Sequence, residues 1–301
     1  MYKLGVNKMN IKLVEGRDFK LIPLINDINE NCEFGIRIEA SDIEHRVDDL
    51  SPQLLRKLIE QYQLVILSGF QSDNTVKSLT QFSESLGQIM MWPFGAVLEL
   101  VEQPNATDHI FANSYVPLHW DGMYLENIPE LQVFQCVAQM SEDAGGRTTF
   151  SSTTIALNRA STETKAIWYQ STGKYQRQVE LYKSTVISPI IELHPYNGQE
   201  VLRFCEPPKE NDENFINPSI YHFETLSEKV DIADLVQSLR NALYDPAAHY
   251  AHTWKKGDVI IADNFSLLHG RESYKSQSGR HVRRVHIHAD KHFKNPHLAQ
   301  K

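Results

Sequence analysis

The chain has 301 residues, of which 41% are hydrophobic and 23% charged, and its formal net charge at pH 7 is −8. This composition supports a large packed core and excludes a disordered chain, while the acidic balance argues against a nucleic-acid-binding protein, which needs a basic surface. No run approaches the roughly 18 uninterrupted apolar residues of a membrane-spanning helix, and the N-terminus lacks the apolar stretch of a secretory signal.

Three cysteines, Cys32, Cys136 and Cys205, are too widely spaced to indicate a disulfide framework or a CxxC zinc site. We therefore expect a cytoplasmic protein that has neither a membrane nor a nucleic acid as a partner. Met1 and Met9 are both candidate translation starts, and the sequence does not choose between them.

The first part of the chain, residues 1–88, indicates an α/β segment. Residues 34–39 alternate like a strand, and residues 64–67 read as a buried strand. A Ser-Pro pair opens an expected helix over 51–62, and a second amphipathic helix is expected over 74–86. We expect this part to pack on the core formed by the rest of the chain.

Residues 89–290 change character, because short β-prone runs alternate with turns and helical stretches. Several short strands of this kind are typical of a sandwich or barrel. The sequence therefore predicts one continuous domain, 1–301, that is mainly β, with an antiparallel double-sheet core and helices packed outside. The expected strands are 96–101, 131–137, 147–151, 258–262 and 280–288, and the expected helical stretches are 153–170 and 227–244.

A His-x-Asp triplet at His119 and Asp121 is the first chemical feature. If the segment is a strand, alternation places both side chains on one face, where they can bind one metal ion. Two histidines and one carboxylate suit Fe(II) and leave positions open for a cosubstrate and O₂. The alternative is a chance triplet, which is common in chains of this length.

Two later features extend the pattern. A Gly-Asp turn, an apolar strand and an Asp-Asn turn lead to His269, which could equally be a structural histidine at a strand end. Arg280 lies eleven residues further on and Arg284 four beyond it, so the two share one face of an extended strand. An arginine fork can bond both oxygens of a carboxylate, although two solvated surface arginines remain the alternative.

Together with Gly145-Gly146-Arg147-Thr148, this order of motifs resembles the taurine dioxygenase-like (TauD/TfdA) family of Fe(II)/2-oxoglutarate dioxygenases. The resemblance implies a double-stranded β-helix core, which is a cupin-like jelly roll. It implies that His119, Asp121 and His269 bind Fe(II), and that Arg280 and Thr148 bind 2-oxoglutarate, with O₂ as the second cosubstrate. Arg147 replaces the family's aspartate, a departure expected to alter the charge near 2-oxoglutarate.

A closer similarity is to the PvcB/IsnB oxygenases of isonitrile pathways. It rests on runs that cover most of the chain beyond about residue 60, namely 91–103, 108–113, 115–126, 202–208 and 283–288. The similarity implies a tyrosine-derived isonitrile acid as substrate and an isonitrile synthase as pathway partner. The implied product is an α,β-unsaturated isonitrile or, by loss of the carboxylate, a vinyl isonitrile. The alternatives are a 2-oxoglutarate-dependent hydroxylase of another small carboxylic acid and a non-catalytic metal- or ligand-binding barrel.

Such a substrate needs a carboxylate anchor and an aromatic slot. Arg284 is the first candidate for the anchor and Arg203 the second, with a structural ion pair as the alternative for each. The candidates for the slot are aromatic residues, for which core packing is the alternative: Tyr115, Tyr124, Phe94 and Trp120. Structural roles are expected for His109 and His194, and no carboxylate is spaced to complete a second metal site with His286 and His288.

Overall fold

The structure is a computed structural model that describes residues 10–14, 17–27, 32–42, 44–139, 141–179, 182–209, 215–228 and 230–299. The two candidate translation starts lie outside these ranges. An eight-stranded sheet is the largest layer, and all its neighbouring strands are antiparallel except the parallel pair β3–β4. Its strands, in spatial order, are β1 (Asn10–Val14), β2 (Arg17–Asp27), β3 (Cys32–Ala40), β4 (Leu64–Ser68), β16 (Val259–Asp263), β8 (Leu131–Ala138), β18 (His281–Ile287) and β5 (Val97–Val101).

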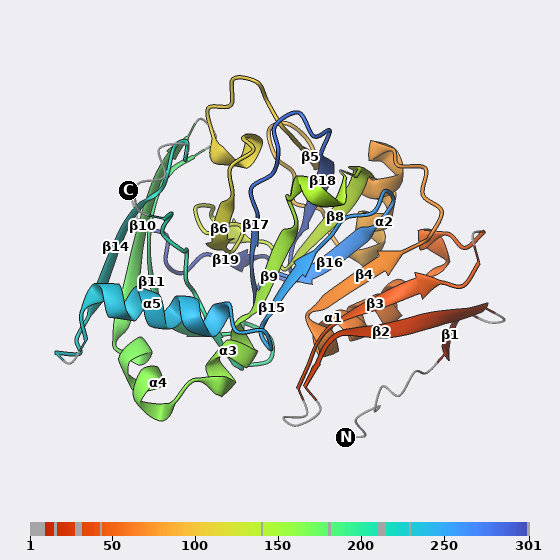
Figure 1. Cartoon of the computed structure of the whole chain (residues 1–301). Helices are drawn as coiled ribbons and strands as arrows, with labels where there is room; N and C mark the ends of the chain where they lie inside the picture. The colour runs from red at the N-terminus through yellow and green to blue at the C-terminus, as the bar shows by residue number, and fades with distance from the viewer. Residues whose placement is uncertain are drawn as a thin grey trace.

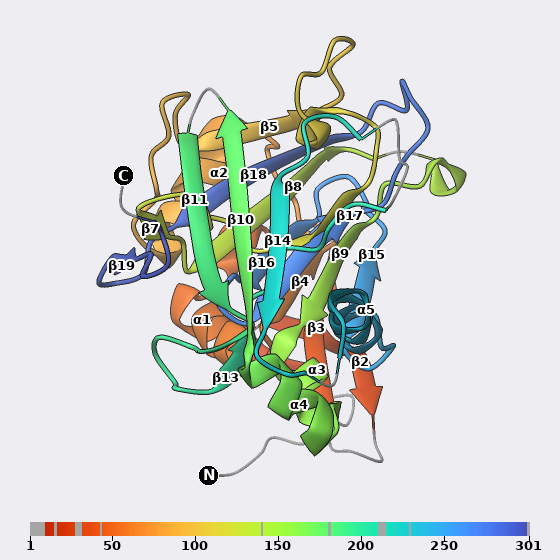
Figure 2. The same ribbon diagram turned by 90° about the vertical axis from the view of Figure 1, so that its left-hand side faces the viewer.

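A second sheet of four strands lies between the large sheet and a further three-stranded sheet (Figure 1). Figure 2 shows the three-stranded sheet from its outer side. The four-stranded sheet has the order β15 (His249–His252), β9 (Thr148–Ser152), β17 (Leu267–Arg271) and β6 (Val116–His119), and the three-stranded sheet the order β11 (Tyr182–Pro189), β10 (Ser171–Val179) and β14 (Ile220–Thr225). Two short pairs complete the strands: β12 (Ile191–Leu193) with β13 (Glu200–Leu202), and β19 (Phe293–Lys294) with β7 (Asn127–Ile128). The mainly β, double-sheet architecture predicted from the sequence is therefore confirmed.

The core divides into two clusters because the large sheet is buried on both faces. On β8, Phe134 and Cys136 face one cluster, whereas Leu131 and Val133 alternate toward the other. Helices α1 (Pro52–Tyr62) and α2 (Val76–Leu86) contribute Leu55, Ile59, Leu79 and other apolar side chains to the second cluster. Each fully buried side chain of this size stabilises the fold by about 1.5–3 kcal/mol relative to its exposed state. Since β4 hydrogen-bonds to β16, the N-terminal part joins the sheet as well as covering it.

Helix ends follow the capping residues of the sequence. The backbone N–H of Leu54 donates to the Ser51 hydroxyl at the start of α1, and Thr75 caps α2 in the same way. The helical stretch expected over 153–170 is interrupted, because Ser161 caps a separate second helix. The remaining helices are α3 (Thr153–Arg159), α4 (Thr162–Tyr169), α5 (Ile232–Leu243) and the short 3-10 helices η1 (Val47–Asp49), η2 (His109–Phe111) and η3 (Glu142–Ala144).

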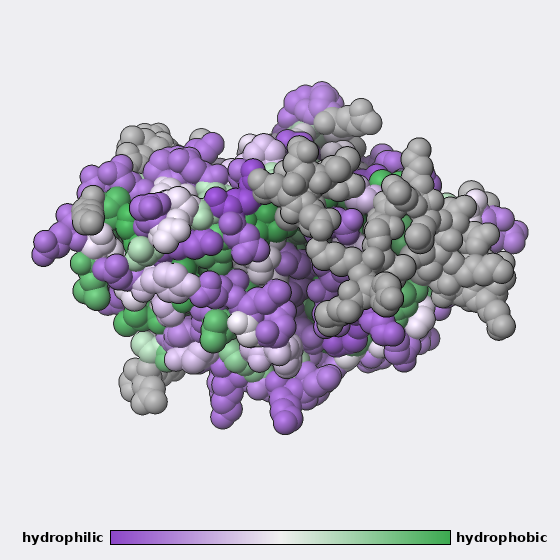
Figure 3. Space-filling view, turned by 90° about the horizontal axis from the view of Figure 1, so that it is seen from below, coloured by the Kyte–Doolittle hydropathy of each residue, from purple (hydrophilic) through white to green (hydrophobic). Residues whose placement is uncertain are grey.

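The lower face of the molecule is mostly hydrophilic, with small apolar areas between polar ones (Figure 3). Scattered apolar side chains of this kind are normal on a protein surface. In the described part of the chain, no helix has the length and apolar character needed to cross a membrane.

Candidate metal centre and its pockets

His119, Asp121 and His269 come together between the two main sheets. One ligand atom from each lies within 4.8 Å of the others. His269 lies in the middle of β17, directly opposite His119 on β6. The strand interpretation of the His-x-Asp triplet was wrong for its second half, because β6 ends at His119 and Asp121 begins a turn. In that turn Gly122 has a φ of 81°, and a Cβ there would lie 2.4 Å from Pro129.

Asn264 holds the backbone of Asp121 in place. The N–H of Asp121 donates to Asn264 Oδ1 at 2.9 Å, and Asn264 Nδ2 donates to the carbonyl oxygens of Asp121 and Pro129 at 3.0 and 2.8 Å. Asn264 is part of the Asp-Asn turn between β16 and β17. The turn that precedes His269 therefore positions Asp121, a role that was expected from the alternation of side chains along one strand.

The carboxylate of Asp121 is surrounded by donors. Its Oδ2 lies 2.6 Å from Gln132 Nε2, 2.7 Å from His286 Nε2 and 2.7 Å from Arg284. Burial opposes ionisation, but the charge of Arg284, with smaller contributions from the neighbouring imidazoles, outweighs it and holds the pKa of Asp121 well below its usual value. Asp121 is thus an anion, which is the form that binds a metal ion.

Both histidines direct a ring nitrogen toward Asp121. Burial, together with the neighbouring His119, lowers the pKa of His269 well below its usual value. His119 Nδ1 donates to the carbonyl of Pro117 at 2.9 Å, which leaves Nε2 facing Asp121 at 3.7 Å. Two imidazoles and one carboxylate form a donor set that fits Fe(II) and leaves several coordination positions open.

One pocket beside the triad suits a small dianion. It is lined by His119, His269, Thr148 and three arginines, with Leu100, Val116 and Phe134 as the apolar part. Arg280 donates to the Gly146 carbonyl at 3.2 Å and to the Thr148 hydroxyl at 3.3 Å. Burial, with the charge of Arg271, lowers the pKa of Arg280 to about 9. Within the described ranges no carboxylate forms an ion pair with Arg280, so its charge is available to a ligand.

Arg271 lines the same pocket and has no counterpart among the residues picked from the sequence. Its guanidinium donates to the carbonyl oxygens of Ile110, His109, Ala112 and Ser114. This arginine therefore orders the loop after β5 and adds positive potential to the pocket. Only its place directly after His269-Gly270 could have drawn attention to it.

A second pocket adjoins the first and shares His119, Val116 and Arg284 with it. Of the candidates for the aromatic slot, Tyr124 and Trp120 line this pocket. Trp92, which the sequence reading did not select, also lines it. Phe94 stacks on Trp92 at 5.5 Å but is 44% exposed and does not line either pocket.

Arg203 and Tyr115 do not line either pocket. Arg203 is 2% exposed, lies 3.5 Å from Glu192 and donates to the Asn264 carbonyl at 3.4 Å. It thus forms the structural ion pair considered as its alternative, and it supports the turn that holds Asp121. The Tyr115 hydroxyl accepts from the backbone N–H of Lys209 on another face of the molecule.

One further expectation needs correction, and one residue has a contact that was not foreseen. Arg147 extends away from the first pocket and donates to Glu272 at 2.7 Å, so its charge is neutralised in a half-exposed pair and does not alter the 2-oxoglutarate region. From the sequence, His286 was considered only for a second metal site; in the structure it contacts Asp121, because β18 runs next to β8.

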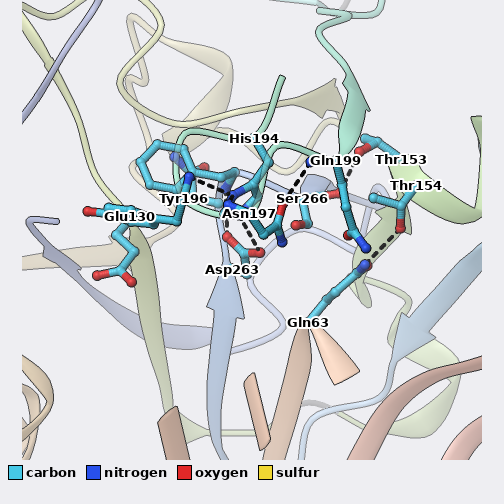
Figure 4. A network of polar contacts seen from close by, with 12 residues as sticks. Gln63, Glu130, Thr153, Thr154, His194, Tyr196, Asn197, Gln199, Asp263 and Ser266 are labelled. Carbon is cyan, nitrogen blue, oxygen red and sulfur yellow. Dashed lines mark hydrogen bonds and ion pairs between the residues drawn. The ribbon is translucent and has the colours of Figure 1, made fainter. Parts of the chain in front are cut away.

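His194 belongs to a separate polar network, shown in Figure 4. Its Nδ1 accepts from the backbone N–H groups of Tyr196 and Asn197, and its Nε2 lies 3.4 Å from Asp263. These contacts agree with the structural role expected for His194, since Asp263 precedes the Asn264 turn. A structural role was also expected for His109, whose Nδ1 lies 3.1 Å from the Ile216 carbonyl oxygen. Unlike His194, however, His109 lines the second pocket beside the triad.

Replacing Gln132 by leucine is expected to weaken metal binding about 10–100-fold, the usual range for loss of a contact to a ligating side chain. The Gln132 amide nitrogen lies 2.6 Å from Asp121 and 3.2 Å from His269 Nδ1. Gln135→Leu is the matched control, because Gln135 lies on the opposite face of the same strand and donates to Ser72. Competition with a chelator measures the effect, and equal affinities in the two variants would contradict it.

Comparison with known proteins agrees with this geometry. The family model described as taurine catabolism dioxygenase TauD, TfdA family, matches residues 30–286, and the chain belongs to this family. The chain is 51% identical to tyrosine isonitrile desaturase of Erwinia amylovora over 92% of this chain and 95% of that protein. It is 33% identical to 3-((Z)-2-isocyanoethenyl)-1H-indole synthase of Fischerella ambigua, over 84% and 92%.

A solved structure of PvcB from Pseudomonas aeruginosa matches with a TM-score of 0.79 and 45% identity, over 94% of this chain and 96% of that one. PvcB is described as an Fe, alpha-ketoglutarate dependent oxygenase from an isonitrile synthetic pathway. The jelly-roll fold implied by the sequence resemblance is therefore confirmed.

Proposed function

We propose that this chain is an Fe(II)- and 2-oxoglutarate-dependent oxygenase that desaturates a tyrosine-derived isonitrile. The observation that carries the proposal is a His-Asp-His cluster shared by two pockets, one suited to a dianion and one lined by aromatic side chains. The 51% identity to a tyrosine isonitrile desaturase supports the substrate.

In this proposal His119, Asp121 and His269 hold Fe(II), and Arg280 with Thr148 binds the distal carboxylate of 2-oxoglutarate. When bound, iron, 2-oxoglutarate and O₂ together supply the oxidant that removes hydrogen from the substrate. The protein's part is to orient the cosubstrate through Arg280 and to keep Asp121 ionised and fixed through Asn264, His286 and Arg284.

Arg284 is the proposed anchor for the substrate carboxylate, since it lines both pockets beside the triad. Removal of a hydrogen atom and one further electron from the benzylic carbon leaves a cationic centre that a para-hydroxyphenyl ring stabilises. Loss of the neighbouring proton then gives an α,β-unsaturated isonitrile, and loss of CO₂ gives a vinyl isonitrile. Both products remain within the proposal.

Two other functions are weaker. A hydroxylase of another small carboxylic acid would use the same metal centre. A non-catalytic barrel has no need for a buried arginine without a carboxylate partner in the described ranges, such as Arg280, beside an ionised ligand cluster.

An isonitrile synthase is the proposed pathway partner, because it would make the substrate. The cytoplasm is the proposed compartment, in line with the free thiols of Cys136 and Cys205.

The experiment is mass analysis of the product formed from the tyrosine-derived isonitrile with Fe(II), 2-oxoglutarate and O₂. Loss of two hydrogen atoms means desaturation, and additional loss of CO₂ means the decarboxylating course. Gain of one oxygen atom would contradict desaturation and favour the hydroxylase. Consumption of 2-oxoglutarate with an unchanged isonitrile would exclude this substrate.

A further inference from the structure

One wall of the second pocket carries polar groups that have no place in metal or 2-oxoglutarate binding. In the three-stranded sheet, Tyr175 on β10 pairs with Tyr221 on β14. Arg177 lies two residues after Tyr175 on β10, and Ser219 lies two residues before Tyr221, just ahead of β14, so alternation places both on the same face as these tyrosines. Ile220, between Ser219 and Tyr221, is 66% exposed and lies on the opposite face. Arg177, Ser219 and Tyr221 all line the pocket. The three-stranded sheet lies on the opposite side of the four-stranded sheet from β18 (Figure 1).

This wall offers hydroxyl groups that both donate and accept. The Tyr124 hydroxyl donates to Ser219 Oγ at 2.8 Å, and Ser219 also contacts the Tyr221 hydroxyl. Ser219 and Tyr124 are 5% and 6% exposed, so a ligand would meet them with little competition from water. A linked set of three hydroxyls can reorient its protons to complement a further hydroxyl group.

The same wall carries no net charge. Arg177 lies 2.5 Å from Asp108, which supplies its counter-charge. Burial, with the charge of Arg177, lowers the pKa of His109 to about 3, so the His109 ring in this pocket is neutral. A neutral polar group fits here, because the Asp108 carboxylate already balances the charge of Arg177.

The end of the pocket beside the triad would carry a net positive charge once a metal ion is bound. Arg284 lies 2.7 Å from Asp121, but His286 shares that oxygen, and a divalent cation held by the triad would outweigh the single charge of Asp121. A substrate carboxylate is therefore stabilised beside Arg284. In a tyrosine-derived isonitrile the carboxylate is close to the benzylic carbon, while the phenolic hydroxyl lies across a rigid ring from it.

We propose that Tyr124, Ser219 and Tyr221, backed by the Arg177–Asp108 pair, form a site for the phenolic hydroxyl of the substrate and determine the preference for a phenol. This inference rests on the proposed function and assigns the far end of the same pocket. It explains why the two polar ends differ in charge: one end receives an anion and the other a neutral hydroxyl.

The test compares the isonitrile of tyrosine with that of phenylalanine, which differs only by the hydroxyl. Dissociation constants are measured calorimetrically without O₂ in the presence of Fe(II) and 2-oxoglutarate, and kcat/KM is measured with O₂. The unchanged protein should favour the tyrosine compound about ten-fold or more, the value of one well-made hydrogen bond in a buried site. In Tyr124→Phe and Tyr221→Phe this preference should fall about ten-fold, because only the tyrosine compound is affected.

Tyr244→Phe is the control, because the Tyr244 hydroxyl donates to Glu206 in a different pocket. This variant should change neither the dissociation constant nor kcat/KM for either compound. Equal losses for both compounds in Tyr124→Phe and Tyr221→Phe would mean a purely structural role and overturn the inference, as would an unchanged protein that binds both compounds equally. If the unchanged protein prefers the tyrosine compound but converts neither, the proposed function fails while the phenol site stands.

Discussion

Replacing Asp121 by alanine is expected to abolish turnover and to weaken Fe(II) binding by more than about 100-fold, since loss of a mere supporting contact already costs about 10–100-fold. Asp121 is the only anion in the cluster, and Arg284 and His286 both contact its carboxylate. Without it, a divalent cation would meet two imidazoles and a nearby arginine. Competition of Fe(II) with a chelator measures the change.

Two further variants separate metal binding from folding. Asp121→Asn keeps the shape but removes the charge, and should lose most of the same affinity. Asp143→Ala removes an exposed carboxylate that pairs with Lys275, and should change nothing. Thermal unfolding of each apoprotein shows whether the fold is intact. An Asp121→Ala protein that is folded and binds Fe(II) as tightly as the unchanged protein would refute the assignment of the triad.

Replacing Arg280 by alanine is expected to raise the 2-oxoglutarate requirement about 100-fold, within the range of about 2–5 kcal/mol for a buried charge pair that loses one partner. Arg280 is 5% exposed and is oriented by Gly146 and Thr148. The other two arginines of the pocket are already engaged, Arg271 by backbone carbonyls and Arg284 by Asp121. The apparent KM for 2-oxoglutarate measures the effect. The KM for the isonitrile should change far less.

Arg283→Ala is the matched control on the adjoining strand. Arg283 pairs with Glu99 and donates to the Asn74 carbonyl, and it lines neither pocket beside the triad. An Arg280 variant with the normal 2-oxoglutarate requirement would show that another group binds the distal carboxylate. Equal effects on cosubstrate and isonitrile would point instead to a general distortion of the site.

The metal triad could be predicted from local motifs taken together with the family resemblance. His119 and Asp121 are two residues apart, and His269 follows the Asp-Asn turn within a few residues. The groups that hold the triad could not be found in this way. Gln132 and His286 come from β8 and β18, and their approach to Asp121 depends on long-range strand pairing that no short motif encodes.

The substrate arginines show the same limit. Arg203 stands in a run that resembles isonitrile-pathway oxygenases, but in the structure it turns toward Glu192 and the Asn264 carbonyl. Arg177 stands in no recognised motif, yet the register of β10 against β14 places it in the pocket. Which arginine faces a cavity is decided by sheet register and by the nearest carboxylate, and sequence spacing determines neither.

The fold class could be predicted from the sequence because short β-prone runs between turns extend over much of the chain.

The central claim is that the triad and the adjoining pocket bind Fe(II) and 2-oxoglutarate together. The most direct measurement is the visible absorption of the protein with both added in the absence of O₂. A metal-to-ligand charge-transfer band should appear only when Fe(II) and 2-oxoglutarate are both present, and it should be absent in Asp121→Ala. A folded, Fe(II)-loaded protein that shows no such band at saturating 2-oxoglutarate would contradict the claim.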